Sequence, residues 1–212
     1  MKSYINDRES RVRINQAISI NFTVKSGVPQ GSVVGPLLYL LYMADLPMDD
    51  NTTTGTFADD TVILATHADP AKATGILQNH LNQIQAWLYK WKIKINETKT
   101  IQVNFTLRRE HCPQVGLNNN NISQSSSVKY LGIYMDSRLT WKDHVIKKRK
   151  QIDLKTKELN WLIGRRSNLS IENKVLLYKT IIKPIWAYGI ELWGCASKSH
   201  ISIIQRSQSK IL

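Results

Sequence analysis

Apolar and polar residues alternate in the first part of the chain, as they do in half-buried β-strands. The apolar positions between residues 11 and 25 are Val12, Ile14, Ile18, Ile20, Phe22 and Val24. A period of two predicts strands. The polar pair Asn15-Gln16 predicts a turn between them. We therefore expect residues 11–25 to form two strands joined near this pair.

A glycine-rich loop follows these strands. Residues 26–32 read Ser-Gly-Val-Pro-Gln-Gly-Ser. Glycine lets a backbone approach a ligand closely, and the amide of Gln30 both donates and accepts hydrogen bonds. A plain connector between a strand and a helix has the same composition. The leucine-rich residues 37–43 then predict a short buried helix, which Pro47 ends.

Two adjacent carboxylates, Asp59 and Asp60, stand between the polar run 51–56 and the β-forming run 61–65. Neighbouring side chains of a strand point to opposite faces, so these carboxylates converge only where the chain bends, as at a tight hairpin turn. Oxygen ligands held at such a turn suit hard cations such as Mg²⁺. Asp is also a favoured turn residue, so the pair alone favours an ordinary acidic turn.

The next part of the chain has helical periodicity. Apolar residues recur every three or four positions, which predicts an amphipathic helix over residues 70–92 that covers the sheet. Asp69-Pro70 supplies an N-cap and a proline at the first helical position. His80 falls on the apolar stripe, where we expect a histidine at the boundary of the core and not a ligand. The helix is therefore interpreted as core.

Weaker patterns follow this helix. Alternation at Ile101, Val103 and Phe105 predicts a strand. Residues 108–127 are rich in Asn and Ser, which predicts an exposed loop. Strand character returns over residues 128–135, where Gly132 indicates a bulge or a close approach by another backbone.

Beyond Trp141 the pattern becomes helical and basic. A second helix is predicted after a cap at Ser170, and Pro184 is expected to kink or interrupt it. Residues 141–212 hold 15 basic and 5 acidic residues, whereas residues 1–140 hold 14 and 11. The excess predicts a polyanionic partner, although such a run is often only a solvated face.

Other features limit the class of protein. The longest nearly apolar run, residues 33–44, is too short to span a bilayer, and the first residues do not form a secretory signal. Cys112 and Cys195 stand alone without metal-ligand spacing, which fits a reducing compartment. We therefore expect an intracellular protein, in cytoplasm or nucleus, with no membrane partner. The sequence carries no indication of oligomeric state.

The order of these pieces resembles the palm of reverse transcriptases, in particular those of jockey-like non-LTR retrotransposons. The motifs that carry the resemblance are the loop 26–32, Phe57-Ala58-Asp59-Asp60, Lys-Ile-Asn-Glu-Thr-Lys-Thr at 94–100, Lys-Tyr-Leu-Gly-Ile at 129–133 and residues 178–184. The resemblance implies an α+β fold. Residues 1–140 would form a polymerase-type palm, an antiparallel sheet backed by helices, and residues 141–212 an all-helical, thumb-like region.

The resemblance also implies roles for residues. Asp59 and Asp60 match the metal-binding hairpin, and Lys99 lies in the lysine-bearing segment behind the palm. The loop beside the templating base and incoming nucleotide is matched by Gly27, Pro29, Gln30 and Gly31. The grip on the primer end is matched by Tyr130, Leu131 and Gly132. The expected contacts with the nucleic-acid backbone are Lys147, Lys148, Arg149, Lys150, Arg165 and Arg166.

In this family the chemistry is nucleotidyl transfer. A primer 3′ hydroxyl attacks the α-phosphate of a deoxynucleoside triphosphate, pyrophosphate leaves, and two metal ions, Mg²⁺ or Mn²⁺, stabilise the attacking and leaving oxygens. The implied partners are an RNA template, a DNA primer and deoxynucleoside triphosphates. Asp59 is our first choice as a direct ligand and Asp60 the second. Lys99 either neutralises the leaving pyrophosphate or only flanks a strand.

One part of the family pattern has no counterpart in these residues. In reverse transcriptases the fingers and a strand with the first metal-binding aspartate precede the glycine loop by several dozen residues, whereas 25 residues precede Ser26. We therefore expect an incomplete catalytic centre, weak metal binding and no activity for this chain alone. The chain would be a piece of a longer polyprotein, a decayed genomic copy or a mispredicted gene model. The alternative function is a non-catalytic fragment that binds nucleic acid.

Overall fold

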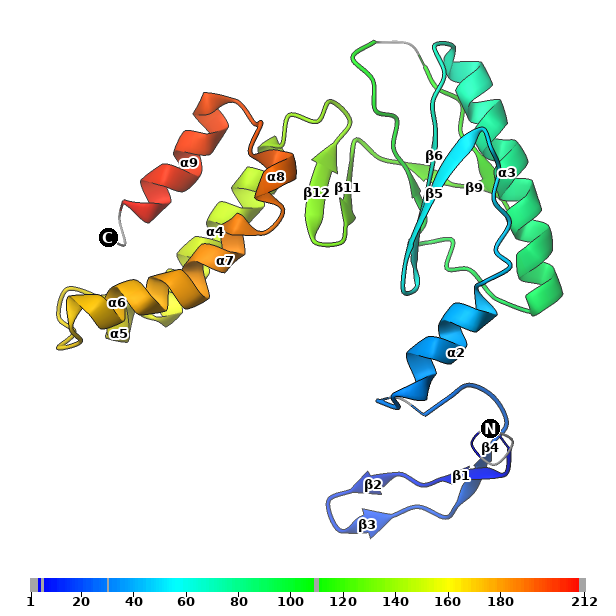
Figure 1. The fold of residues 1–212 in the computed structure, drawn as a ribbon, viewed down its shortest axis with the longest axis horizontal. Helices are drawn as coiled ribbons and strands as arrows, with labels where there is room; N and C mark the ends of the chain where they lie inside the picture. Colours follow the sequence, from blue (N-terminus) through cyan, green and yellow to red (C-terminus); the bar gives the residue numbers. More distant parts are fainter. Residues whose placement is uncertain (1–3, 5, 30, 109–110, 210–212) are drawn as a thin grey trace. The chain divides into compact units, whose positions relative to one another are not determined.

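The computed structural model describes residues 4, 6–29, 31–108 and 111–209, which form a mixed α+β structure of small two-stranded sheets and helices (Figure 1). The α+β class predicted from the sequence is confirmed at this level. The chain divides into two compact units, Met1–Pro47 and Met48–Leu212. The expected division into a palm at 1–140 and a thumb at 141–212 stays a prediction.

The first unit begins with the two predicted strands, and each of them is divided into two short segments. Strand β1 (Arg8–Ser10) pairs with β4 (Phe22–Val24), and β2 (Arg13–Ile14) pairs with β3 (Ala17–Ile18), all antiparallel. The turn falls at Asn15-Gln16, where Asn15 has a φ of 53°, so the predicted turn is confirmed. Most of the alternating apolar side chains are nevertheless exposed, because the described residues of this unit form no second layer over them: Val12, Ile14, Ile18, Ile20 and Phe22.

The predicted short helix is present as α2 (Val34–Tyr42) and ends before Pro47. Its predicted burial is wrong. Gly35 is its one buried residue, and Leu40 is 65% exposed. Leucine content shows that a helix has apolar surface to bury, but burial requires an opposing surface, and the strands of this unit do not supply one.

The second unit opens with a hairpin and a long helix. Strands β5 (Thr52–Phe57) and β6 (Asp60–Ala65) are antiparallel, and helix α3 (Pro70–Trp91) packs against them. The Asp69 carboxylate accepts a hydrogen bond of 2.8 Å from the Ala71 N–H at the start of α3, which confirms the predicted N-cap. The predicted apolar stripe is buried at His80, Leu81, Ile84, Trp87 and Leu88.

The strand predicted around residue 101 is shorter than expected, and its sides are reversed. Strand β7 (Ile101–Gln102) pairs in parallel with β10 (Ser123–Gln124). Ile101 is 44% exposed, whereas Gln102 is buried. The Gln102 side chain donates to the Pro113 carbonyl (3.0 Å) and accepts from the Val115 N–H (3.0 Å). These two bonds satisfy the buried amide and so permit a polar residue inside.

The exposed loop predicted at 108–127 is also a wrong prediction. Within it, β8 (Gly116–Leu117) and β9 (Asn120–Asn121) form a small hairpin that packs against α3. Val115, Leu117 and Ile122 are buried in one apolar cluster with Leu81. Three apolar side chains among many Asn and Ser are thus enough to fix this segment against the helix.

The last part of the chain consists of one hairpin followed by helices. Strands β11 (Ser127–Tyr130) and β12 (Ile133–Asp136) are an antiparallel hairpin. The Ser170 hydroxyl accepts from the Asn173 N–H, which confirms the predicted cap. The helical elements are α4 (Lys142–Glu158), α5 (Asn160–Ile163), α6 (Ile171–Leu177), the π-helix η1 (Tyr178–Ile182), α7 (Lys183–Ala187), α8 (Ile190–Trp193) and α9 (Lys198–Gln208).

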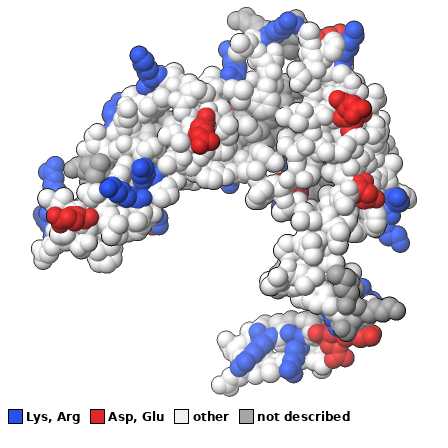
Figure 2. All heavy atoms as spheres, viewed as in Figure 1, with Lys and Arg blue, Asp and Glu red and all other residues white. Residues whose placement is uncertain are grey.

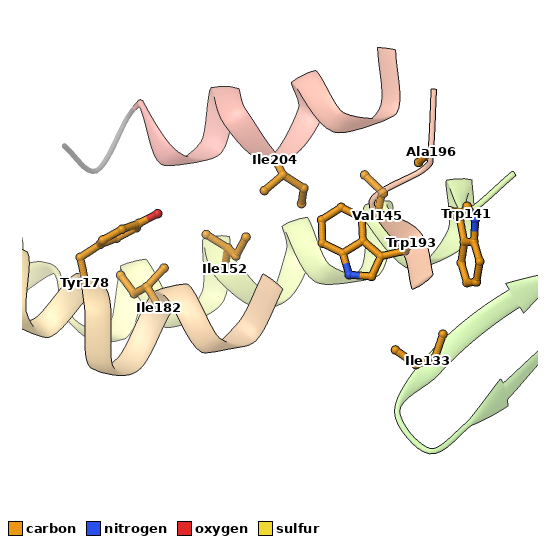
Figure 3. Close-up of a cluster of buried hydrophobic side chains, with 9 residues drawn as sticks. All are labelled: Ile133, Trp141, Val145, Ile152, Tyr178, Ile182, Trp193, Ala196 and Ile204. Carbon is orange, nitrogen blue, oxygen red and sulfur yellow. The ribbon is translucent and has the colours of Figure 1, made fainter. Parts of the chain in front are cut away.

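Pro184 interrupts the helix as predicted. The π-helical turn η1 lies just before it, and the Lys183 N–H bonds to the Tyr178 carbonyl. A cluster of buried apolar side chains holds these helices together (Figure 3). Its residues come from β12, α4, η1, α8 and α9, with two from the segments that precede α4 and α9: Ile133, Trp141, Val145, Ile152, Tyr178, Ile182, Trp193, Ala196 and Ile204. No helix within the described residues is long and apolar enough to cross a bilayer.

Candidate active site and nucleic-acid interface

Asp59 and Asp60 lie at the tip of the β5–β6 hairpin. Phe57 pairs with Asp60, so the turn is the two residues Ala58 and Asp59. Ala58 has a φ of 49°, a left-handed conformation that a tight hairpin turn requires. Both carboxylates are exposed. The predicted tight turn is confirmed, and it places these two consecutive aspartates at an accessible tip.

The two faces of this hairpin differ. Ile63 packs against the cluster that contains Leu81 of α3. Asp60 and Leu64 lie on the other face, because side chains alternate along a strand, and Phe57 joins them through its pairing with Asp60. Phe57 is 63% exposed. The hairpin is therefore held by one face and leaves the carboxylate-bearing face uncovered.

The base of the hairpin is tied to α3 by polar contacts. The Thr52 hydroxyl and the Nδ1 atom of His80 are 2.7 Å apart, and Gln83 donates to the Asp49 carboxylate at 3.2 Å. A hydrogen bond from the Asn51 N–H is the main reason that the pKa of Asp49 is lowered. His80 is fully buried and not at the core boundary as expected, because Thr52 satisfies its ring nitrogen.

The donor set at the tip fits a hard cation only in part. Two carboxylates supply oxygen ligands of the kind that Mg²⁺ takes from proteins. Across residues 4, 6–29, 31–108 and 111–209, no group of three or more His, Cys, Asp or Glu residues could hold a metal ion. Asp59 and Asp60 would thus supply two oxygen donors, and substrate or water would have to supply the rest.

The glycine-rich loop lies in the first unit. Gly27 and Gly31 have φ values of 78° and 80°, conformations that other residues rarely adopt. The Arg8 guanidinium donates to the carbonyls of Ser26 (3.1 Å) and Gly27 (2.6 Å) and so fixes the start of the loop. Pro29 is exposed. Gln30 lies outside the described residues.

Lys99 lies in an exposed turn after α3. Its N–H bonds to the Asn96 carbonyl at 3.1 Å. Glu97, in the same turn, accepts from the side chains of Asn118 and Asn120 at 2.8 and 2.7 Å, and these two bonds lower its pKa. The turn is therefore tied to the β8–β9 hairpin. The role of Lys99 towards pyrophosphate stays a prediction.

Tyr130, Leu131 and Gly132 lie at the tip of the β11–β12 hairpin. The turn consists of Leu131 (φ 45°) and Gly132 (φ 79°), so Gly132 is a turn residue and not a bulge. A Cβ atom on Gly132 would lie 3.3 Å from the ring of Tyr188. The close approach expected at Gly132 comes from this side chain and not from another backbone. The Tyr188 hydroxyl also donates to the Leu131 carbonyl at 2.7 Å.

The basic residues predicted to contact nucleic acid differ in exposure. Lys147, Lys150, Arg165 and Arg166 are exposed. Arg149 pairs with Asp153 at 3.4 Å. On the face drawn in Figure 2, Lys and Arg side chains are scattered singly or in small groups.

Lys148 differs from these residues because it is 8% exposed. Its ammonium lies 5.3 Å from the centre of the Tyr188 ring. Burial, and then the charge of Lys129, lowers its pKa.

Comparisons with known proteins identify the family. The sequence pattern of the reverse transcriptase (RNA-dependent DNA polymerase) family matches residues 1–135. The chain is 40% identical to the probable RNA-directed DNA polymerase from transposon X-element of Drosophila melanogaster and 35% identical to the RNA-directed DNA polymerase from mobile element jockey of the same organism. Both alignments cover the whole chain and 24% of the relative. The chain belongs to the reverse transcriptases of jockey-like non-LTR retrotransposons.

The alignments cover every candidate residue of this reverse transcriptase fragment. The range matched by the family pattern, residues 1–135, includes the glycine-rich loop, Asp59-Asp60 and residues 130–132. The X-element relative extends the match through the helices. The chain spans about a quarter of the length of these relatives, and no solved structure matches it.

Sequence reasoning missed the residues that join the β11–β12 hairpin of this reverse transcriptase fragment to its helices. The Asp136 carboxylate accepts hydrogen bonds from the N–H groups of Arg138, Thr140 and Trp141 at 3.2, 3.0 and 2.8 Å. His144 accepts from the Tyr134 N–H at 3.2 Å. Asp136 caps no helix, because α4 begins at Lys142 without a side-chain N-cap; an Asp directly before a turn is instead a signal that its side chain bonds to the backbone of that turn. No local pattern indicates the pairing of Tyr188 with Leu131, which are 57 residues apart.

Proposed function

We propose that these residues supply the metal hairpin and the primer-side surface of an RNA-directed DNA polymerase. The reaction would be transfer of a nucleotide from a deoxynucleoside triphosphate to a primer 3′ hydroxyl on an RNA template. Two Mg²⁺ or Mn²⁺ ions would stabilise the attacking and leaving oxygens. In phosphoryl-type transfer the protein mainly positions groups and stabilises charge.

The observation that carries this proposal is the hairpin tip. A two-residue turn places adjacent, exposed carboxylates at the end of a hairpin whose other face is anchored to α3. This arrangement occurs in a chain of the reverse transcriptase family. An ordinary acidic turn needs neither a second carboxylate nor a rigid base, and this hairpin has both.

Each part of the site has an expected role. Asp59 is the first choice as a metal ligand, and Asp60 shares the uncovered face with Phe57. Lys99 would neutralise the leaving pyrophosphate. The loop with Gly27, Pro29, Gln30 and Gly31 would lie beside the templating base and incoming nucleotide. The tip with Tyr130, Leu131 and Gly132 would hold the primer end. The basic helical residues would contact phosphates: Lys147, Lys148, Arg149, Lys150, Arg165 and Arg166.

The proposal includes inactivity of the 212 residues by themselves. Among the residues that the structure describes, Asp59 and Asp60 belong to no cluster of three metal-ligating side chains. Catalysis with two metals depends on positions accurate to about 1 Å, and an error of that size costs roughly 10²-fold. A missing ligand would therefore prevent turnover. Without further protein, the chain would be a non-catalytic module that binds nucleic acid, which is the alternative function.

Primer extension tests the proposal. The assay compares residues 1–212 alone with the same residues joined to the flanking parts of the X-element relative, on an RNA template with a DNA primer and Mg²⁺. We expect extension only by the joined protein. Extension by the 212 residues alone, lost on Asp59→Ala, would show that the ligands present are sufficient. No extension by the joined protein would contradict the polymerase proposal.

A further inference from the structure

Three lysine side chains gather around two tyrosine rings beside the tip of the β11–β12 hairpin. The Lys147 ammonium lies 3.8 Å from the centre of the Tyr134 ring, and the Lys129 ammonium lies 5.8 Å from the same centre. The two ammonium groups are thus no farther apart than the sum of these distances. Lys148, next to Lys147 in α4, lies over the ring of Tyr188.

Contacts between the hairpin and the helices hold this lysine cluster in place. Tyr188 donates to the Leu131 carbonyl at the hairpin tip, and the Tyr134 N–H donates to His144 of α4. Both contacts join β11–β12 to the helices. Lys129 on the hairpin and Lys147 on α4 are consequently brought together by two elements and not by one basic run of sequence.

Carboxylates on the same helix pair with other residues. Arg149–Asp153 and Lys155–Glu158 are ion pairs of α4, and neither includes a lysine of the cluster. Two ammonium groups repel each other, and the repulsion grows as water is excluded. Burial, and then the same repulsion from Lys129, lowers the pKa of Lys148. The cluster is therefore a site that an anion would stabilise.

We infer that Lys129 and Lys147 together contact one phosphate of a nucleic-acid backbone, and that the buried Lys148 adds to the positive charge beside it. This inference rests on the proposed function and deepens it, because it defines a single phosphate site shared by the hairpin and helix α4. The phosphate would lie beside residues 130–132, which the proposed function assigns to the primer end. A backbone phosphate is favoured over an acidic peptide because the chain belongs to a family that copies RNA into DNA.

The test measures binding of the 212-residue chain to a labelled primer–template duplex over a range of salt concentrations. Lys129→Gln and Lys147→Gln are made singly and together. Lys148 is left intact because its burial makes misfolding of a variant the simpler result. Lys157→Gln is the matched control, since Lys157 is an exposed lysine of the same helix outside the cluster. Circular dichroism confirms that each variant folds.

One shared phosphate predicts a specific pattern. Each phosphate contact contributes about 0.9 to the slope of log affinity against log salt. The slope of log affinity against log salt should fall in the double variant by the amount expected for about one phosphate contact. Its fold-loss of affinity should be smaller than the product of the fold-losses of the two single variants. Losses that multiply, with about two contacts' worth of slope, would show two separate phosphates and overturn the inference.

Neutral methylphosphonate linkages, placed one at a time in the primer, identify the phosphate. One linkage should weaken the wild type and leave the double variant unchanged. Inorganic pyrophosphate at constant ionic strength should not compete with the duplex. If it competes with the wild type but not with the double variant, the site takes a free phosphate ligand and the inference fails.

Two further outcomes separate this inference from the proposed function. If the wild type binds the duplex and the double variant matches Lys157→Gln, this inference alone fails, and the cluster serves another anion such as an acidic protein. If the wild type does not bind the duplex at low salt, both fail.

Discussion

Acidification should destabilise the helical part of the chain through His144. Its imidazole is fully buried and packs near the rings of Tyr134 and Trp193, with centroids 6.2 and 5.7 Å away. Burial, and then the Lys148 ammonium, lowers the pKa of His144 from its ordinary 6.5 to about 4. The Nδ1 atom accepts from the Tyr134 N–H, so the folded chain holds the neutral ring. Protonation would place an unpaired charge inside this cluster.

The direction follows from the two pKa values. The imidazole of the unfolded chain binds a proton more tightly than that of the folded chain. The neutral ring therefore makes its full contribution to the free energy of unfolding above pH 6.5, and this contribution is lost as the pH falls towards 4. The loss is about 2 kcal/mol by pH 5 and roughly 3 kcal/mol below pH 4. Carboxylates with lowered pKa values, such as Asp136, stay ionised at pH 5 and do not add to the effect there.

Urea unfolding at pH 7.5 and pH 5, followed by tryptophan fluorescence, measures this loss. His144→Asn keeps an oxygen that can accept the Tyr134 N–H and removes the titration, so its stability should change little between the two pH values. Replacing the exposed His111 with Asn is the control and should keep the wild-type decrease. A wild-type decrease that persists in His144→Asn would refute the argument.

Three further predictions concern the hairpins. Asp136→Ala should lower the free energy of unfolding by about 1–3 kcal/mol in urea, because it leaves the partly buried N–H of Trp141 unpaired; an effect equal to that of Asp50→Ala would contradict this. Tyr188→Phe keeps the ring and removes the bond to Leu131, so hydrogen exchange at the β11–β12 tip should accelerate while global stability falls by only about 1 kcal/mol. Unchanged exchange would show that the bond is unimportant. Paramagnetic broadening by Mn²⁺ should be weak and centred on Asp59, and tight binding that survives Asp59→Asn would refute the metal assignment.

Local patterns predicted the elements that local chemistry determines. The period of apolar residues and the Asp69 cap located α3 to within one residue at its C-terminal end. The alternation around Asn15-Gln16 and the two aspartates before the β-forming run 61–65 located these two hairpin turns. Each of these features depends on residues close together in the sequence. The candidate metal residues were therefore accessible to sequence reasoning.

Features that depend on distant partners could not be predicted. Gln102 is buried because Pro113 and Val115 satisfy its amide, a fact that no alternation of residues contains. Leu37, Leu40 and Leu41 of α2 are exposed because the neighbouring strands do not cover them. The ring of Tyr188 lies beside Gly132, and the Tyr188 hydroxyl bonds to Leu131, which is 57 residues earlier in the chain. The lysine cluster could not be predicted either, because it depends on the contacts that join the β11–β12 hairpin, which carries Lys129, to α4.

The central claim is that the tip of the β5–β6 hairpin holds the metal used in nucleotidyl transfer. The most direct test is primer extension by the joined protein, comparing Asp59→Ala with Asp50→Ala. Asp50 is an exposed aspartate just before β5 and does not lie at the tip. We predict that Asp59→Ala abolishes template-dependent extension in Mg²⁺ and that Asp50→Ala retains it. Full extension by folded Asp59→Ala protein would contradict the claim.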